Sequence, residues 1–117
     1  LQQAADAGDA DALAVLAEFY LAGQVLPQNS RRGRDYQSRA AEAGAASAQL
    51  AMAQRFATGE GVEQDYVQAH IWANLAAARG EAGAAEQRDA VARFLSPEEL
   101  ERAQDMATEW LEQAADD

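Results

Sequence analysis

The chain repeats a pattern of small and large apolar residues with a period of 36 residues. A run of alanines that ends at Gly8 recurs before Gly44 and, less completely, before Gly80. The same step joins Tyr36 to Trp72. A fixed period of this size is typical of a solenoid, in which each unit buries its apolar face only against its neighbours. The period therefore favours a stacked array of similar units over a single closed core.

The composition indicates an all-α protein. Alanine is abundant, whereas the 8 glycines and 2 prolines fall mostly between apolar stretches, and 117 residues are enough for one modest domain. The chain has no cysteine, which excludes disulfides, thiolate metal sites and a thiol nucleophile. Its apolar runs are shorter than the ~20 residues that span a bilayer, so we expect no direct membrane insertion.

The net charge of −11 excludes one broad class of partner. Proteins bind nucleic acids mainly by neutralising phosphates, and this acidic chain lacks the positive field that such binding needs. Three arginines, Arg31, Arg32 and Arg34, form the only local basic cluster. The cluster is either a solvated helix end or a contact for an acidic partner.

Helix boundaries are predicted from capping residues and glycines. Asp9 suits the N-cap of one helix and Asn29 that of the next. Asp65 with Gln68 resembles a capping box, and Ser96 begins the clearest helix start in the chain, Ser-Pro-Glu-Glu. After the end of a truncated helix at residues 1–7, the expected helices span about 10–22, 29–43, 45–58, 66–79, 82–95 and 97–114, the last being a terminal cap.

Large apolar residues recur once or twice in each expected helix, and we expect them to form the core. Alanines at the repeated positions remove bulk where helices cross, which lets their axes approach closely. The gain from burying a tryptophan, a few kcal/mol as an upper estimate, exceeds that of an exposed ion pair. The predicted core residues are Leu16, Met52, Tyr20, Phe56, Tyr36 and Trp72.

These motifs resemble the Sel-one-like repeat (SLR), a relative of the tetratricopeptide repeat (TPR). The fit is best in the second unit, which reads Gly44, Ala48, Met52, Phe56, Gly59-Glu60-Gly61-Val62, Asp65-Tyr66, Ala69, Trp72 and Ala76-Ala77. The resemblance implies a TPR-like right-handed α/α superhelix, a solenoid of antiparallel helix pairs with a C-terminal capping helix. It places one domain at 1–117, with repeats at 8–43 and 44–79 and a partial repeat plus cap at 80–117.

The resemblance also implies a function, namely a non-catalytic scaffold for a protein or peptide partner. It points to a larger bacterial protein of the periplasm or envelope, acting in signalling or localisation. One alternative is a structural segment that extends or caps a longer array, or self-associates through an open N-terminal edge. A more distant one is binding of a peptidoglycan or polysaccharide fragment. His70 is the only histidine, so the partners of a catalytic triad or a metal site are missing, and we expect no cofactor.

The candidate binding surface follows from the related tetratricopeptide architecture, in which the first helix of each pair lines the concave side. The residues on that side are small and mildly acidic, which suits an extended peptide or a helix with basic residues. Asp11 and Glu18 are alternatively just the solvated side of a buried helix. The predicted binding residues are Asp11, Ala14, Val15, Glu18, Leu21, Ser47, Leu50, Ala51, Gln54 and Gln87.

Overall fold

The computed structural model describes residues 2–22 and 27–116, and in this part of the chain every regular element is an α-helix. The predicted all-α class is confirmed. The helices are α1 (Gln2–Asp6), α2 (Ala10–Ala22), α3 (Pro27–Glu42), α4 (Ala46–Thr58), α5 (Tyr66–Ala78), α6 (Ala84–Ala92) and α7 (Pro97–Asp116).

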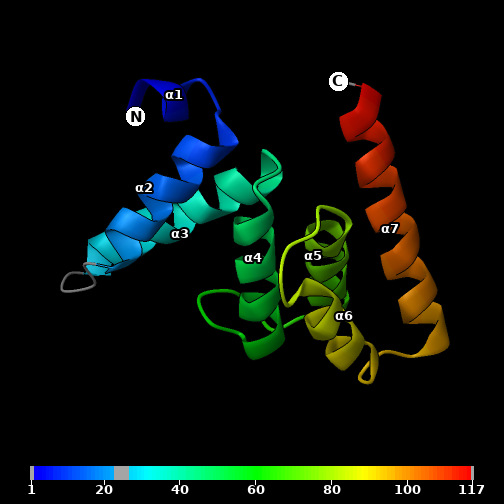
Figure 1. Cartoon of the computed structure of the whole chain (residues 1–117). Coiled ribbons are helices and arrows are strands. Elements are labelled where there is room, and N and C mark those ends of the chain that lie inside the picture. Colours follow the sequence, from blue (N-terminus) through cyan, green and yellow to red (C-terminus); the bar gives the residue numbers. More distant parts are fainter. Residues whose placement is uncertain (1, 23–26, 117) are drawn as a thin grey trace.

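Consecutive helices form antiparallel pairs that stack along the chain, as the solenoid interpretation requires (Figure 1). The first pair is α2 with α3, and the second is α4 with α5. Helix α5 is the most enclosed element, because it packs against α4, α6 and α7. The two pairs meet where α3 ends and α4 begins, and the α2–α3 pair is inclined away from α4 (Figure 1). This inclination shapes the candidate site.

The N-cap residues were predicted correctly at three helices, but the box expected between Asp65 and Gln68 is not formed, because the Asp65 amide donates to the Phe56 carbonyl. Asp9 Oδ1 accepts a hydrogen bond from the Ala12 amide at 2.9 Å, and Asp65 Oδ1 accepts from the amides of Val67 and Gln68. At α7 the capping box is complete. The Ser96 amide donates to Glu99 Oε1 at 2.9 Å, and the Glu99 amide donates to Ser96 Oγ at 3.1 Å. Such a cap stabilises a helix by about 1 kcal/mol.

The predicted boundaries of two helices were wrong. Helix α3 begins at Pro27, so Asn29 lies inside the first turn instead of capping it. Proline is well suited to a first helical turn, since its fixed φ is helical and its missing amide hydrogen has no partner there. Helix α6 spans only Ala84–Ala92, shorter than the predicted 82–95, and Gly83 precedes it with a φ of 84°.

The predicted core residues differ in how deeply they are buried. Leu16, Met52 and Trp72 are buried, as predicted. The other three, Tyr20, Tyr36 and Phe56, are half-buried and pack against the core from its edge. The ring of Trp72 meets that of Trp110 edge-on, with centroids 5.4 Å apart, so helix α7 covers the second pair as a cap should.

The first pair contains an exchange of side-chain bulk relative to the second. A Cβ atom on Gly33 would lie 2.5 Å from Leu21 Cγ, so the space beside this glycine is filled by the leucine. One repeat later the equivalent positions are Ala57 and Ala69. The first pair thus combines a leucine with a glycine where the second pair has two alanines.

Candidate functional site between the first and second helix pairs

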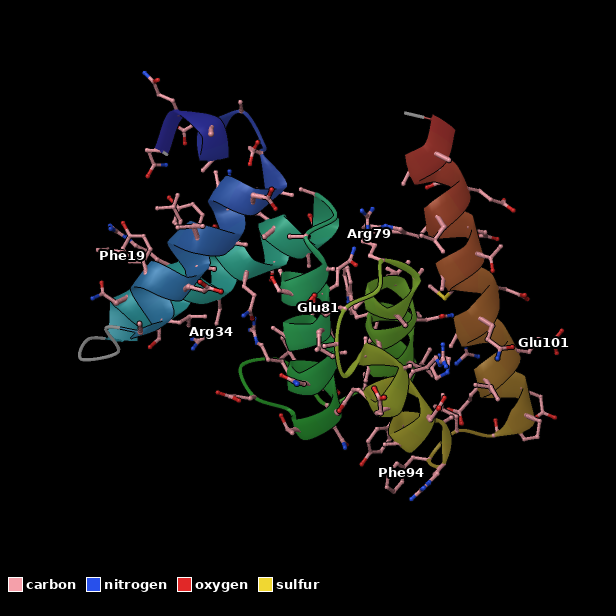
Figure 2. The ribbon with its side chains drawn as sticks, in the orientation of Figure 1. Phe19, Arg34, Arg79, Glu81, Phe94 and Glu101 are labelled. Atoms are coloured by element: carbon pink, nitrogen blue, oxygen red, sulfur yellow. The ribbon has the colours of Figure 1, made fainter. Side chains whose placement is uncertain are left out.

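The inclination of the first pair opens a hollow of about 210 Å³ between α2–α3 and α4. Helix α4 forms one wall, the last turn of α2 and the middle of α3 form the other, and the loop after α4 closes one end. Figure 2 shows Arg34 of α3 at the edge of the space between the two pairs. The hollow is lined by Leu21, Arg34, Gln37, Ala51, Gln54, Arg55 and Glu60.

Arg55 lines the hollow and is only 9% exposed. Its Nη1 donates to Gln37 Oε1 at 2.9 Å, across the boundary between the pairs, and its Nε donates to the Glu60 carbonyl at 3.2 Å. Burial lowers the pKa of Arg55, and the nearby charge of Arg34 acts in the same direction while Glu60 opposes them. Because arginine titrates far above neutral pH, the guanidinium stays charged.

Gly61 approaches both Arg34 and Arg55 closely. A Cβ atom at Gly61 would lie 2.7 Å from Arg34 Cδ, and 3.0 Å from both Arg34 Nε and Arg55 Nη2. The two nitrogens are therefore within about 6 Å of each other. The φ of Gly61 is +73°, a conformation that other residues rarely adopt, so any side chain here would be strained and would displace the arginines.

Neither of these two arginines forms an ion pair within the described residues 2–22 and 27–116. The ion pairs found there join Arg39 with Asp35 and Arg88 with Asp89. A second hollow, of about 230 Å³, is lined by one arginine, Arg79, and one carboxylate, Glu42. The first hollow thus combines two neighbouring cations with a single wall carboxylate, Glu60, that pairs with neither.

The structure brings three of the predicted binding residues, Leu21, Ala51 and Gln54, into the hollow. The other predicted residues lie outside it. Of these, Asp11, Val15, Glu18 and Ser47 are exposed, and Ala14, Leu50 and Gln87 are half-buried.

Val15 belongs to a different face of α2 from Leu21. With 3.6 residues per turn, Val15 and Phe19 are neighbours, and Phe19 lies almost opposite Leu21. Phe19 is 70% exposed and Val15 48%. Figure 2 shows Phe19 on the side of α2 away from α4. These two residues form an outer apolar face of the first pair.

Sequence reasoning did not assign Gln37, Arg55 and Glu60 to the site. Arg34 was noticed only as part of a basic cluster, and the fold divides that cluster. Arg34 enters the hollow, whereas Arg32 lies over the Tyr20 ring, 5.9 Å from its centroid. The one available signal for Arg55 was the repeat pattern. Arg55 stands between the repeated apolar residues Met52 and Phe56, in a part of the helix that packs near the neighbouring unit.

His70 is a buried packing residue of α5, only 2% exposed, and its Nδ1 has no hydrogen-bond partner among the described residues. Burial lowers its pKa, with the Arg88 charge adding to the effect and Asp89 opposing it. The described residues contain no cluster of three or more His, Cys, Asp or Glu side chains arranged to hold a metal ion. Of the helices within residues 2–22 and 27–116, none has both the length and the apolarity to cross a bilayer.

Comparison with known proteins agrees with this architecture. The Sel1 repeat model matches residues 10–44, 46–81 and 96–117. The crystal structure of c5321, a protective antigen of uropathogenic Escherichia coli strains displaying an SLR fold, is 27% identical with a TM-score of 0.80, over 95% of this chain but 24% of that one. The chain thus spans about a quarter of that protein.

A Sel1 repeat protein from Oxalobacter formigenes is 26% identical with a TM-score of 0.61, over 89% of this chain and 94% of that one. No curated protein matches the chain. Proteins of this repeat class are commonly non-catalytic interaction scaffolds. On the three matched repeats and the stacked helix pairs, this chain belongs to the Sel1 repeat family.

Proposed function

We propose that this chain is a non-catalytic scaffold that binds a protein partner along the face formed by α2 and α4. The observation that carries the proposal is the hollow between the two helix pairs, where Leu21, Ala51 and Gln54 come together. A concave surface that combines apolar and polar groups can bury part of a partner and fix its orientation. Here Leu21 and Ala51 supply the apolar part, and amide and guanidinium groups supply the polar part.

Filling the hollow with a bulky side chain tests this proposal without changing any charge. Gln54 is exposed, so Gln54→Trp should leave the fold intact and block the hollow. Gln104→Trp on α7 is a matched control, because that residue is also an exposed helical glutamine whose carbonyl accepts a bond from a threonine hydroxyl, as Gln54 does.

The measurement is quantitative mass spectrometry of proteins captured from native cell extract by the three baits. We expect the wild-type and Gln104→Trp proteins to enrich the same partner, and Gln54→Trp to lose it at an unchanged melting temperature. Equal capture by all three baits would show that the partner does not bind along α2 and α4.

A second candidate function is array extension or self-association through the outer face of the first pair. Phe19 is one repeat before Arg55 and two before Val91, and both of those residues are buried. The same repeat position is thus covered in the later units and 70% exposed in the first. A preceding unit or a second copy would bury Phe19 and Val15.

Light scattering tests whether a second copy covers this face. A dimer that Phe19→Ser converts to a monomer supports self-association, whereas a wild-type monomer rejects it.

For the compartment, we propose the bacterial periplasm or cell envelope, in a signalling or localisation protein. The support is that the two solved structures described above are of bacterial proteins. Fractionation of native cells with an antibody against residues 97–116 checks this placement, and recovery in the cytosolic fraction alone would reject it.

A further inference from the structure

The same two repeat positions meet differently at the two junctions between units. At the first junction, between α3 and α4, they are Arg34 and Arg55. One repeat later, between α5 and α6, they are His70 and Val91. His70 and Val91 are 2% and 3% exposed, so the second junction is closed by a neutral ring and an aliphatic side chain. The repeat can therefore be built without cations at these positions.

Two unpaired cations are costly for a junction that has only a structural role. The guanidinium nitrogens of Arg34 and Arg55 are within about 6 Å of each other and repel, and Arg55 has in addition lost most of its hydration. At the second junction the nearby cation, Arg88, is paired with Asp89 at 3.2 Å. The first junction lacks such a partner among the described residues, and its hollow opens to solvent beside the two cations.

We propose that Arg34 and Arg55 bind a carboxylate of the partner, a Glu or Asp side chain of an acidic segment lying along α2 and α4. This inference rests on the proposed scaffold function and specifies the partner's chemistry. Arginine presents parallel N–H donors that match the two oxygens of a carboxylate. Arg55 Nη1 and Nε are already occupied, which leaves Nη2 beside Arg34 to meet the ligand.

A carboxylate fits the hollow better than a phosphate does. Two arginines and the Glu60 carboxylate give the hollow a net charge of about +1, which a single carboxylate neutralises and a phosphate dianion exceeds. The amides of Gln37 and Gln54 can hydrogen-bond to the backbone of an entering segment. The net charge of −11 does not prevent this binding at physiological salt, because charges beyond about 8 Å are largely screened.

Titration of the protein with the capped peptides hexaglutamate and hexaglutamine tests the proposal by NMR. The Nε–Hε signals of the arginines report directly on ligand contact. We expect hexaglutamate to shift the Arg34 and Arg55 signals in a saturable manner, and hexaglutamine to leave them in place. Inorganic phosphate, titrated separately, should bind more weakly than hexaglutamate.

Three variants locate the effect. Arg34→Gln should weaken hexaglutamate binding about tenfold, the loss expected for one charge-assisted hydrogen bond. Arg31→Gln removes the same charge from an exposed position of the same helix and should change the affinity less than about twofold. Arg34→Lys keeps the charge but lacks the parallel N–H donors of arginine, and it should give an intermediate affinity. Unchanged backbone amide spectra show that each variant is folded.

Several results would overturn the proposal. They are no saturable shift at Arg34 and Arg55, equal weakening by Arg34→Gln and Arg31→Gln, or tighter binding of phosphate than of the peptide. None of them touches the scaffold proposal, which is decided by capture with the Gln54→Trp bait. Loss of partner on that bait without hexaglutamate binding would leave a scaffold whose partner is not acidic.

Discussion

The two helix pairs share a repeat pattern but differ in what covers them. In the second pair, α5 is enclosed by α4, α6 and α7, and its side chains Ala73, Leu75 and Ala76 are 0% exposed. The first pair meets the rest of the molecule mainly through the contact of α3 with α4. It leaves an open hollow on one side and exposed Phe19 on the other. Equivalent residues therefore serve packing in one pair and remain available for contacts in the other.

The aromatic residue of the second helix shows this difference most directly. Trp72 is 9% exposed and covered by Trp110, whereas its equivalent, Tyr36, is half-buried and stacks on Tyr20 with centroids 5.6 Å apart. We expect Trp72→Ala to lower the free energy of unfolding by about 3–5 kcal/mol and Tyr36→Ala by less than about 2 kcal/mol. Urea unfolding followed by circular dichroism measures both. Equal losses would mean that the two pairs are equally packed.

The exchange of bulk between Leu21 and Gly33 gives the next largest effect. Gly33→Ala places a methyl group 2.5 Å from Leu21 Cγ and should destabilise the protein by about 1–3 kcal/mol, despite the higher helix propensity of alanine. Adding Leu21→Ala recreates the alanine pair of the second unit and should recover part of the loss. A double-mutant cycle in thermal unfolding measures the coupling. A purely additive cycle would show that the two residues do not compensate each other.

The N-cap of α7 should make a smaller contribution to the free energy of unfolding, and its effect should be specific to the second pair. Ser96→Ala removes the Oγ that accepts from the Glu99 amide, keeps the bond from its own amide to Glu99 Oε1, and should cost about 1 kcal/mol. Asp9→Ala is the counterpart at α2 in the first pair. Amide hydrogen exchange distinguishes the two, since Ser96→Ala should accelerate exchange in α5 and α7 and Asp9→Ala in α2. Faster exchange in α2 on Ser96→Ala would mean that the pairs unfold as one unit.

The smallest expected effect is the pH dependence due to His70. Because the fold lowers the His70 pKa below the unfolded value near 6.5, the unfolded chain takes up the proton first as the pH falls. The stability contributed by neutral His70 is therefore complete above about pH 6.5 and is lost as the pH falls through the folded pKa. Replacing the histidine by glutamine, His70→Gln, should reduce the change in melting temperature between pH 7 and pH 5. An unchanged slope would assign the acid sensitivity to the carboxylates.

The fold was predictable from the sequence because its determinants are local. Periodic alanines and capping residues such as Asp9 and Ser96 act within one or two turns, and the structure contains the hydrogen bonds they imply. The errors at Asn29 and at the ends of α6 are of the same local kind, where a proline and a glycine outweighed the expected boundary.

The site was only partly predictable, because it depends on how the two pairs are inclined to each other. Leu21, Ala51 and Gln54 were identified from helix faces alone. Arg34 and Arg55 are distant in the sequence and meet where α3 packs against α4, close to Gly61 of the following loop. A periodic pattern contains no information on that angle, so two cations that look solvated in the sequence come to share a hollow.

The central claim is that one repeat position is open at the first junction, where Arg34 lines the hollow, and closed at the second, where His70 is buried. The chain has no cysteine, so the single substitutions Arg34→Cys and His70→Cys each give one thiol for labelling. The measurement is the rate of reaction with a thiol reagent in native buffer, relative to the rate in urea. We expect fast labelling of the Arg34→Cys variant and labelling of the His70→Cys variant that is slower by at least about tenfold. Equal rates would contradict it.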